Sequence, residues 1–512
     1  MALIDIRLPK PVAAALRLSR NSPERQQLRA LKKLLKKARF TEFGQLYRFD
    51  EILMSENPAK KFQDLVPVHD YNRIYQRWWK KTLEGIPDVS WPGKIRYYAL
   101  SSGTSDAASK YIPVTKEMLR SNTINYIRQL ISLATYDELP RGALGKGFLM
   151  LGGTTDLQKG KAGWFAGDLS GILAKNRPFW FQTFYKPGGK IARVKDWNEK
   201  LNEIVEKARE WDIGFIVGVP AWCQMCMEMV IEHYKVKNIH EIWPNFGFFV
   251  HGGVAFEPYK KGFEKLLGKP IVYIENYLAS EGFIAFKNRQ HAQGMHLILN
   301  NNIFMEFVPF DSKNFDSDGN IVERPEVLMV QEVEEDKDYA ILLSTNAGAW
   351  RYLIGDTIRF IDKKKMEIRI TGRTKHFLSL VGEHLSVDNM NQAVDQVSRE
   401  LNISIPEYTV AGLPDGNFFA HQWYVACNDP VESNELRKRI DQKLRELNDD
   451  YAVERDSALK QVRLQKLPEN IFLQFMEAKG KVGGQHKFPR VLKGRMYEDW
   501  VKYLKEEGLV EA

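Results

Sequence analysis

The chain has 512 residues, of which 44% are hydrophobic and 12% aromatic, a composition typical of a globular protein with two or three packed units. Three cysteines are too few for a disulfide scaffold, so we expect a reducing compartment and a cytoplasmic protein. Residues 1–40 hold eleven Lys and Arg against two acidic residues. The rest of the chain is balanced, and we expect no nucleic-acid or membrane partner.

The first element expected is a helix that begins at Ser22-Pro23. Its apolar positions form one stripe that should dock on the protein body: Leu28, Leu31, Leu35 and Ala38. Four lysines, Lys32, Lys33, Lys36 and Lys37, then face solvent. The alternative is a basic amphipathic segment that binds a membrane or a nucleic acid. No signal peptide and no transmembrane stretch is evident.

A strand-like run, Tyr97 to Leu100, leads into a loop of small hydroxyl residues around a glycine: Ser101, Ser102, Gly103, Thr104 and Ser105. Such a loop can cradle anionic oxygens with its N–H and O–H donors, and Lys110 adds a charge that suits phosphate. The loop is not a Walker A motif, and by itself it is also compatible with an ordinary turn.

Three strand-like runs, 147–153, 214–218 and 246–253, alternate with helical stretches at 197–210 and 227–235. This alternation predicts a layered α/β fold with a partly parallel sheet, and ligands bind such sheets outside the carboxyl ends of strands. We expect the hydroxyl loop and the two motifs that follow it along the chain to lie at such strand ends. Cys223 and Cys226 form a C-x-x-C pair without further ligands, which favours two cysteines packed on one helix over a metal site.

The second motif is a β-branched strand from Ile271 that we expect to end in a loop with Tyr277, Ser280 and Glu281. This set can stack a base, donate to a phosphate and ligate Mg²⁺, a cation that takes oxygen ligands. The alternative interpretation is a core tyrosine and a surface acid.

In the third motif, Asp356 follows Gly355 at an expected strand end, and a second strand leads to Arg373. Asp356 can accept hydrogen bonds from both hydroxyls of a ribose, and Arg373 can pair with phosphates. A plain turn is the alternative. We place a domain boundary here, with a large domain over 1–372 and a small one over 373–512. Glycines at 480, 483 and 484 put Lys487 on a flexible loop of the small domain.

Together these motifs resemble the adenylate-forming acyl-CoA synthetase and luciferase superfamily. In detail they resemble one branch, the auxin-responsive Gretchen Hagen 3 family of acyl-acid amido synthetases. The matching segments are Thr41 to Gly44, Ser101 to Ser105, Lys110 to Pro113, Tyr277 to Glu281, Tyr352 to Asp356 and Gln485 to Arg490. The first of them has the form T-x-F-G, in which the resemblance implies that the N-terminal helix ends. The chain departs from the family at Asp106-Ala107-Ala108 and at Leu278-Ala279, beside the nucleotide and acyl sites respectively.

The resemblance implies an α/β fold with a large adenylate-forming domain of layered sheets and helices and a small mobile α+β domain. It implies an ATP- and Mg²⁺-dependent ligase that forms an acyl-adenylate from a carboxylic acid and passes the acyl group to an amine, here an amino acid. Coenzyme A as acceptor, or an acid-binding protein without turnover, are the alternatives. The chain is expected to act as a monomer.

By the same resemblance, the hydroxyl loop holds phosphates, Tyr277 flanks adenine and Ser280 touches the α-phosphate. Glu281 ligates Mg²⁺ and Asp356 holds the ribose. Arg373 is a hinge and a nucleotide contact. Lys487 neutralises charge that develops on the α-phosphate.

Overall fold

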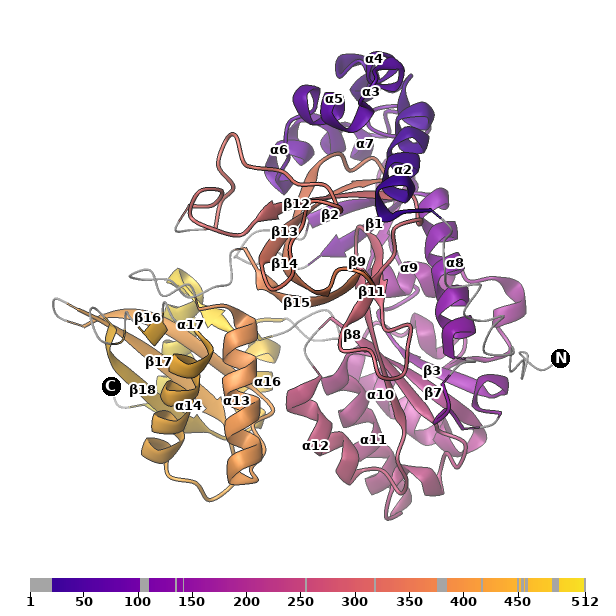
Figure 1. Cartoon of the computed structure of the whole chain (residues 1–512). Helices are drawn as coiled ribbons and strands as arrows, with labels where there is room; N and C mark the ends of the chain where they lie inside the picture. The colour runs from indigo at the N-terminus through magenta and orange to yellow at the C-terminus, as the bar shows by residue number, and fades with distance from the viewer. Residues whose placement is uncertain are drawn as a thin grey trace.

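The computed structural model describes residues 21–101, 110–133, 136–140, 142–253, 256–316, 319–374, 385–415, 418–448, 451–452, 455, 459–480 and 488–510. An N-terminal helical cap sits on a body built from two sheets, and a third sheet forms a separate C-terminal unit beside the body (Figure 1). The predicted α/β class is confirmed. The predicted boundary at residue 372 falls in the last strand before the C-terminal unit, and the division into two domains that move stays a prediction.

Helix α2 (Pro23–Ala38) begins where the sequence predicts, because the Ser22 hydroxyl accepts the backbone N–H of Arg25 at 3.3 Å. Its buried face comprises Gln27, Ala30, Leu31, Leu34, Leu35 and Ala38, whereas the four lysines are exposed. The stripe therefore docks on the body as predicted at Leu31, Leu35 and Ala38, whereas Leu28 is only half-buried. The cap continues with α3 (Glu42–Leu46), α4 (Phe49–Met54), α5 (Pro58–Leu65), α6 (Tyr71–Ile74) and α7 (Lys80–Leu83).

The T-x-F-G segment does not end the first helix, which is a correction to the sequence-based expectation. α2 stops at Ala38, and Thr41 caps the new helix α3 by accepting the N–H of Gly44 at 3.0 Å. A Cβ on Gly44 would lie 2.2 Å from the carbonyl oxygen of Ala38, so only glycine permits this close crossing.

The large sheet has the order β12-β13-β14-β15-β11-β10-β9-β8-β7-β3-β6. Its strands are β3 (Gly147–Leu151), β6 (Tyr185–Lys186), β7 (Ile213–Gly218), β8 (Phe248–Gly252), β9 (Val272–Ala279), β10 (Gly282–Phe286), β11 (Met295–Leu297), β12 (Ile303–Pro309), β13 (Asp338–Thr345), β14 (Tyr352–Asp362) and β15 (Glu367–Arg373). Pairing is parallel from β6 to β9 and antiparallel from β9 to β12. A smaller sheet has the order β2-β1-β5-β4, from β1 (Tyr97–Ser101), β2 (Lys110–Val114), β4 (Gln158–Lys159) and β5 (Phe165–Gly167).

Helices cover both faces of the parallel half, which explains its continuous apolar runs. Phe249 packs with α10 (Trp197–Lys207), α11 (Pro220–Tyr234) and α12 (Glu257–Lys265), whereas its neighbour Phe248 packs in a cluster with residues of α8 (Lys116–Leu133) and α9 (Leu169–Lys175). Helix α11 begins at Pro220, seven residues earlier than the expected stretch 227–235, because proline is well suited to the first turn. Cys223 and Cys226 are buried on it as free thiols.

The C-terminal unit is a four-stranded sheet of order β18-β17-β16-β19, formed by β16 (Tyr408–Asp415), β17 (Phe418–Ala426), β18 (Leu459–Leu467) and β19 (Val491–Leu492). Helices α13 (Val387–Leu401) and α14 (Ser433–Leu447) cover one face, and α16 (Asn470–Ala478) and α17 (Gly494–Glu506) cover the other. In Figure 1, α13 faces α12 of the body, and the two helices are in contact.

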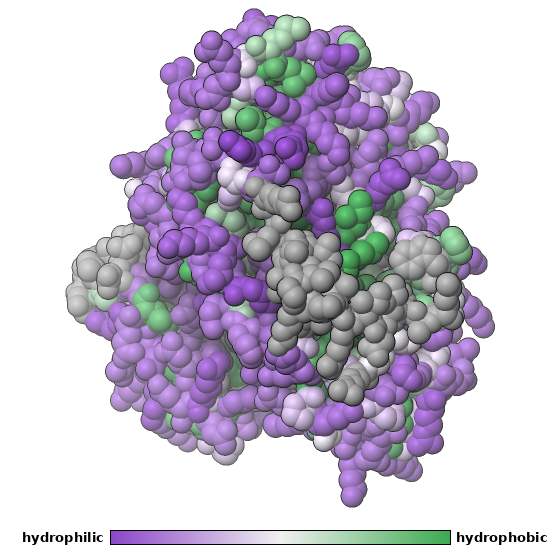
Figure 2. All heavy atoms as spheres, turned by 45° about the vertical axis from the view of Figure 1, so that its right-hand side comes forward, coloured by the Kyte–Doolittle hydropathy of each residue, from purple (hydrophilic) through white to green (hydrophobic). Residues whose placement is uncertain are grey.

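Hydrophilic side chains predominate on the face shown in Figure 2, with small, scattered hydrophobic patches. Within the described ranges, no helix is long and apolar enough to cross a membrane.

Candidate active site

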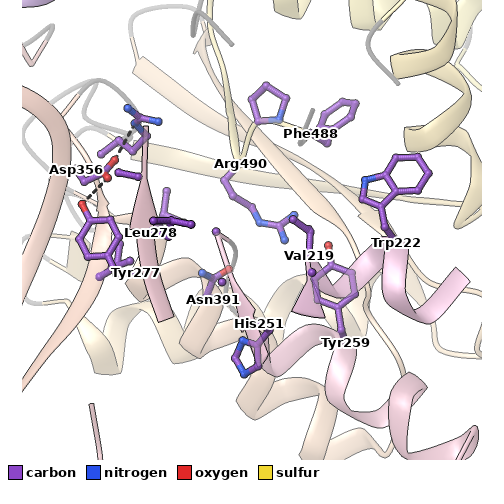
Figure 3. Close-up of a pocket in the computed structure, with 18 of the residues that line it drawn as sticks. Val219, Trp222, His251, Tyr259, Tyr277, Leu278, Asp356, Asn391, Phe488 and Arg490 are labelled. Atoms are coloured by element: carbon purple, nitrogen blue, oxygen red, sulfur yellow. Dashed lines mark hydrogen bonds and ion pairs between the residues drawn. The ribbon is translucent and has the colours of Figure 1, made fainter. Parts of the chain in front are cut away.

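An open cavity of about 1700 Å³ lies between the large sheet and the C-terminal unit. The carboxyl ends of β3, β7 and β8 border it, together with the turn between β9 and β10, the strands β14 and β15, and α13. The C-terminal unit also contributes Phe488 to Val491 (Figure 3). A space of this size is large enough for a nucleotide and a second substrate together.

Asp356 is the centre of a polar cluster at one end of this cavity. Its carboxylate accepts a hydrogen bond from the Tyr277 hydroxyl at 2.5 Å and pairs with Arg373 Nε at 3.3 Å (Figure 3). Arg373 also donates to the carbonyl oxygen of Ile354 at 3.2 Å. The structure thus brings together three residues that the sequence predicted for one ligand, although they lie up to 96 positions apart.

Strand register explains why Asp356 and Arg373 meet. They are direct partners across the antiparallel pair β14–β15. Asp356 does not sit at a strand end, as the sequence suggested, because β14 continues to Asp362. Gly355 instead adopts a φ of +90°, which favours glycine, within an irregularity of the β13–β14 pairing that bends the strand immediately before the carboxylate.

Glu281 lies in the tight turn between β9 and β10, with only 7% of its surface exposed. Burial, followed by the nearby negative charge of Asp356, raises the pKa of Glu281 to about 7, although Lys110 and Arg373 oppose the shift. Tyr277 belongs to strand β9 and not to a following loop, which corrects the expectation, since β9 extends to Ala279. Burial also raises the pKa of Tyr277 well above its ordinary range, so its hydroxyl stays a donor.

Two further predicted residues line the same cavity, Ser280 in the turn and Lys110 at the start of β2. The backbone of Ser101 pairs with Lys110 in the β1–β2 hairpin. Ser102, Gly103, Thr104, Ser105 and Lys487 lie outside the described residues. The three nucleotide motifs do not all follow carboxyl ends of parallel strands, because the first sits on the smaller sheet and the third in an antiparallel pair.

Sequence reasoning missed the opposite wall of the cavity. Gly152 and Gly153 after β3, Gly218 at the end of β7 and His251 in β8 line it. All lie in the three strand-like runs that the sequence identified. Because parallel strands end at the same edge of a sheet, that alternation could have predicted this wall.

Within the described ranges, no group of three or more His, Cys, Asp or Glu side chains is arranged to hold a metal ion.

Comparison with protein families gives three matches along the chain. The GH3 family N-terminal domain matches residues 13–205, the GH3 family central domain matches 296–373 and the GH3 family C-terminal domain matches 388–496. The chain belongs to the GH3 family. The resemblance seen in the sequence motifs is thereby confirmed.

Curated relatives of the chain are distant GH3 proteins. The chain is 24% identical over 208 residues to the probable indole-3-acetic acid-amido synthetase GH3.9 of Oryza sativa subsp. japonica, across 38% of this chain and 45% of the relative. It is 25% identical over 221 residues to the indole-3-acetic acid-amido synthetase GH3.4 of Arabidopsis thaliana, across 41% of this chain and 34% of the relative. The matches span less than half the length of either relative.

Solved structures match over nearly the whole chain. GH3.15 acyl acid amido synthetase superimposes with a TM-score of 0.76 at 15% identity, covering 98% of this chain and 96% of the other. 2-Hydroxyisobutyryl-CoA ligase in a postadenylation state, in complex with 2-HIB-AMP, superimposes with a TM-score of 0.60 at 12% identity, over 95% and 92%. At these identities the likeness establishes a shared fold.

Proposed function

We propose that this GH3 protein is an ATP- and Mg²⁺-dependent ligase that activates a carboxylic acid as an acyl-adenylate and transfers the acyl group to an amine, specifically an amino acid. The observation that carries the proposal is the cluster of Asp356, Tyr277 and Arg373 beside Glu281 and Lys110 on one large cavity. These groups match the ribose, the phosphates and the metal of one ligand.

The nucleotide lies, in this proposal, against the end of the cavity that holds Asp356. Tyr277 and Arg373 fix the carboxylate, and an ionised carboxylate has about four acceptor positions, which leaves room for two ribose hydroxyls. Arg373 and Lys110 supply positive charge for the phosphates, with Ser280 as a further donor. Tyr277 forms the wall that we propose flanks the adenine.

The residues present fit Mg²⁺ bound with a nucleotide. Mg²⁺ usually keeps several waters and takes one or two carboxylates together with substrate phosphates. Glu281, with Asp356 as its acidic neighbour, provides that type of donor. When bound, the ion neutralises phosphate charge, while the protein's part is to hold an ionised Glu281 in place.

The reaction needs positioning more than covalent chemistry from the protein. A carboxylate oxygen of the acid attacks the α-phosphorus of ATP and pyrophosphate leaves. Lys487 is predicted to neutralise the charge that develops there. The amine then attacks the acyl carbonyl, the bond to the phosphate oxygen breaks, AMP leaves and the amine loses a proton to solvent. The apolar wall with Val219, Trp222 and Leu278 suits the body of the acid.

Pyrophosphate release across a panel of carboxylic acids tests this proposal. Two relatives are named for indole-3-acetic acid and one solved GH3.15 structure holds 2,4-DB, so both acids start the panel. We expect at least one acid to release pyrophosphate from MgATP. Mass spectrometry with amino acids and with coenzyme A then decides the acceptor. A thioester product without an amide product would establish coenzyme A as the acceptor. No pyrophosphate release with any acid of the panel would contradict adenylation.

A further inference from the structure

Arg490 belongs to the C-terminal unit, yet its side chain extends into the cavity (Figure 3). The backbone around it is fixed to β16. The Pro489 carbonyl accepts the Thr409 hydroxyl at 2.7 Å, and the Arg490 carbonyl accepts the N–H of Val410 at 3.0 Å. The position of Arg490 is therefore set by the sheet.

One edge of the Arg490 guanidinium is held by its own unit. Nη1 donates to the carbonyl oxygen of Tyr408 at 2.9 Å and pairs with the carboxylate of Glu407, and the guanidinium carbon lies 4.4 Å from the centre of the Tyr408 ring. Only 13% of the Arg490 side chain is exposed. Because a guanidinium carries five N–H donors in a rigid fork, fixing Nη1 leaves Nη2 and Nε on a second edge.

The guanidinium also reaches the body across the cavity. It is hydrogen-bonded to the hydroxyl of Tyr259, which comes from α12, and lies near Val219 at the start of α11 (Figure 3). Val219 gives α11 no side-chain cap, so the positive end of that helix adds to the charge of Arg490 there.

This part of the cavity is separate from the proposed nucleotide end. In Figure 3, Leu278 lies between the pair Asp356–Tyr277 and Arg490. An amine that attacks the acyl carbonyl must approach from a side that the AMP group does not occupy. An amino acid brings a carboxylate one carbon away from its amine, and a partly buried arginine edge is the donor that matches it.

We propose that Arg490 binds the α-carboxylate of an amino acid acceptor, with Tyr259 as a second donor, and so selects amino acids over simple amines. The proposal rests on the proposed function. In the step it serves, the amine nitrogen forms a bond to the acyl carbon, the electron pair of the broken C–O bond leaves with AMP, and the amine proton passes to water. Glu407 and Tyr259 keep the guanidinium oriented, and its remaining N–H donors together with the Tyr259 O–H receive the substrate.

The test compares each amino acid with its decarboxylated amine: leucine with 3-methylbutylamine, tyrosine with tyramine and tryptophan with tryptamine. Using an acid that releases pyrophosphate, we expect the native protein to prefer at least one amino acid on the order of 30-fold or more in kcat/KM, the size of a hydrogen bond to a charged group. Arg490→Met should remove that preference mainly through KM. It should leave acid-dependent pyrophosphate release and the use of the amine unchanged.

Two further variants keep the test decisive. Arg490→Lys retains a charge for Glu407 and should fold if Arg490→Met does not, but it loses the fork and should keep only part of the preference. Arg399→Met is the matched control, because Arg399 lines the same cavity but is paired with Asp395 at 2.7 Å. It should not change the ratio of amino acid to amine.

Equal losses with amino acid and amine, or an equal loss of pyrophosphate release, would overturn the proposal and make Arg490 structural. A native protein without preference between amino acid and amine would overturn it too. If no acid releases pyrophosphate, the proposed function fails first. Equilibrium dialysis of labelled leucine, tyrosine and tryptophan against native protein and Arg490→Met then decides, since equal binding contradicts a carboxylate site.

Discussion

At the scale of single residues, Glu281 combines burial with a function that needs its charge. Its pKa of about 7 means that protons compete with a metal for the same oxygens near neutral pH. We therefore expect activity at limiting Mg²⁺ to rise as pH increases through about 7, and the midpoint to move to lower pH when Mg²⁺ is raised. If the midpoint pH is the same at every Mg²⁺ concentration, Glu281 does not bind the metal. Initial rates over a grid of pH and Mg²⁺ measure it.

The same carboxyl links stability to pH. Its folded pKa lies above its unfolded value near 4.5, so its contribution to stability is complete below pH 4.5 and is lost as pH rises through about 7. The lost contribution amounts to roughly 3 kcal/mol. Glu281→Gln should therefore melt higher than the native protein at pH 8 without Mg²⁺, and no higher at pH 4.5. A higher melting temperature at both values would show an effect of packing alone.

Asp356 offers the sharpest residue test of the nucleotide end. Asp356→Asn keeps the shape but removes the charge that Arg373 pairs with, and it weakens acceptance from ribose. We expect KM for ATP to rise by about 10- to 100-fold, with little change in KM for the acid.

Asp338→Asn is the matched control for Asp356→Asn. Asp338 pairs with Arg359 across β13 and β14 at 2.9 and 3.1 Å and does not line the cavity. Its loss should cost stability and leave KM for ATP unchanged. The same rise in KM in both variants would mean that damage to the sheet, and not ribose binding, is being measured.

At the scale of elements, the bend at Gly355 aims Asp356. A Cβ at Gly355 would have its nearest neighbour, Arg373 Nη2, at 3.5 Å, so Gly355→Ala meets no clash and only the cost of a φ of +90°. That cost is about 1–2 kcal/mol, which the strand can avoid by straightening. We expect KM for ATP to rise and the melting temperature to fall by a few degrees.

Gly93 provides the control for the bend, since it has a φ of +79° and nothing within 4 Å of its added Cβ. Gly93→Ala carries the same backbone cost away from the cavity. It should lower the melting temperature similarly and keep KM for ATP. If Gly355→Ala binds ATP normally, the bend does not serve the site.

Elements also show what sequence can and cannot predict. The start of α2, its buried stripe and the strands that border the cavity follow from local signals, namely a capping serine, helical spacing and apolar runs. The bend within β14 and the strand position of Tyr277 do not, because pairing with β15 and β10 extends both strands past their turn-like residues. The fixed orientation of the Arg490 guanidinium was not predicted either, because its partners Glu407 and Tyr408 lie more than eighty positions away in the sequence.

At the scale of the whole molecule, a lysine of the body makes polar contacts with the C-terminal unit. Lys261 of α12 donates to the carbonyl oxygens of Ser398 and Ile403, at 3.1 and 3.3 Å, at the end of α13. A cation at a helix C-terminus is favourable there. Lys261→Met should lower the equilibrium constant for docking of the C-terminal unit on the body by on the order of 5-fold. It should therefore change the ratio of the adenylation rate to the acyl-transfer rate.

Lys260→Met controls for the loss of a lysine on the same helix, since Lys260 is exposed and lies 3.8 Å from Glu264. Single-turnover rates of both half-reactions, with solution scattering for compactness, measure the effect. Equal rates in the two variants and the native protein would mean that Lys261 does not set the position of the unit.

The central claim, that a carboxylate is activated on the α-phosphorus of ATP, is tested most directly with an acid labelled by ¹⁸O in its carboxylate. When this acid is turned over with an amine, attack on the α-phosphorus leaves one labelled oxygen on AMP, which mass spectrometry detects. We predict AMP with one ¹⁸O and unlabelled pyrophosphate. Label in inorganic phosphate together with ADP, or unlabelled AMP, would contradict the acyl-adenylate and with it the proposed function.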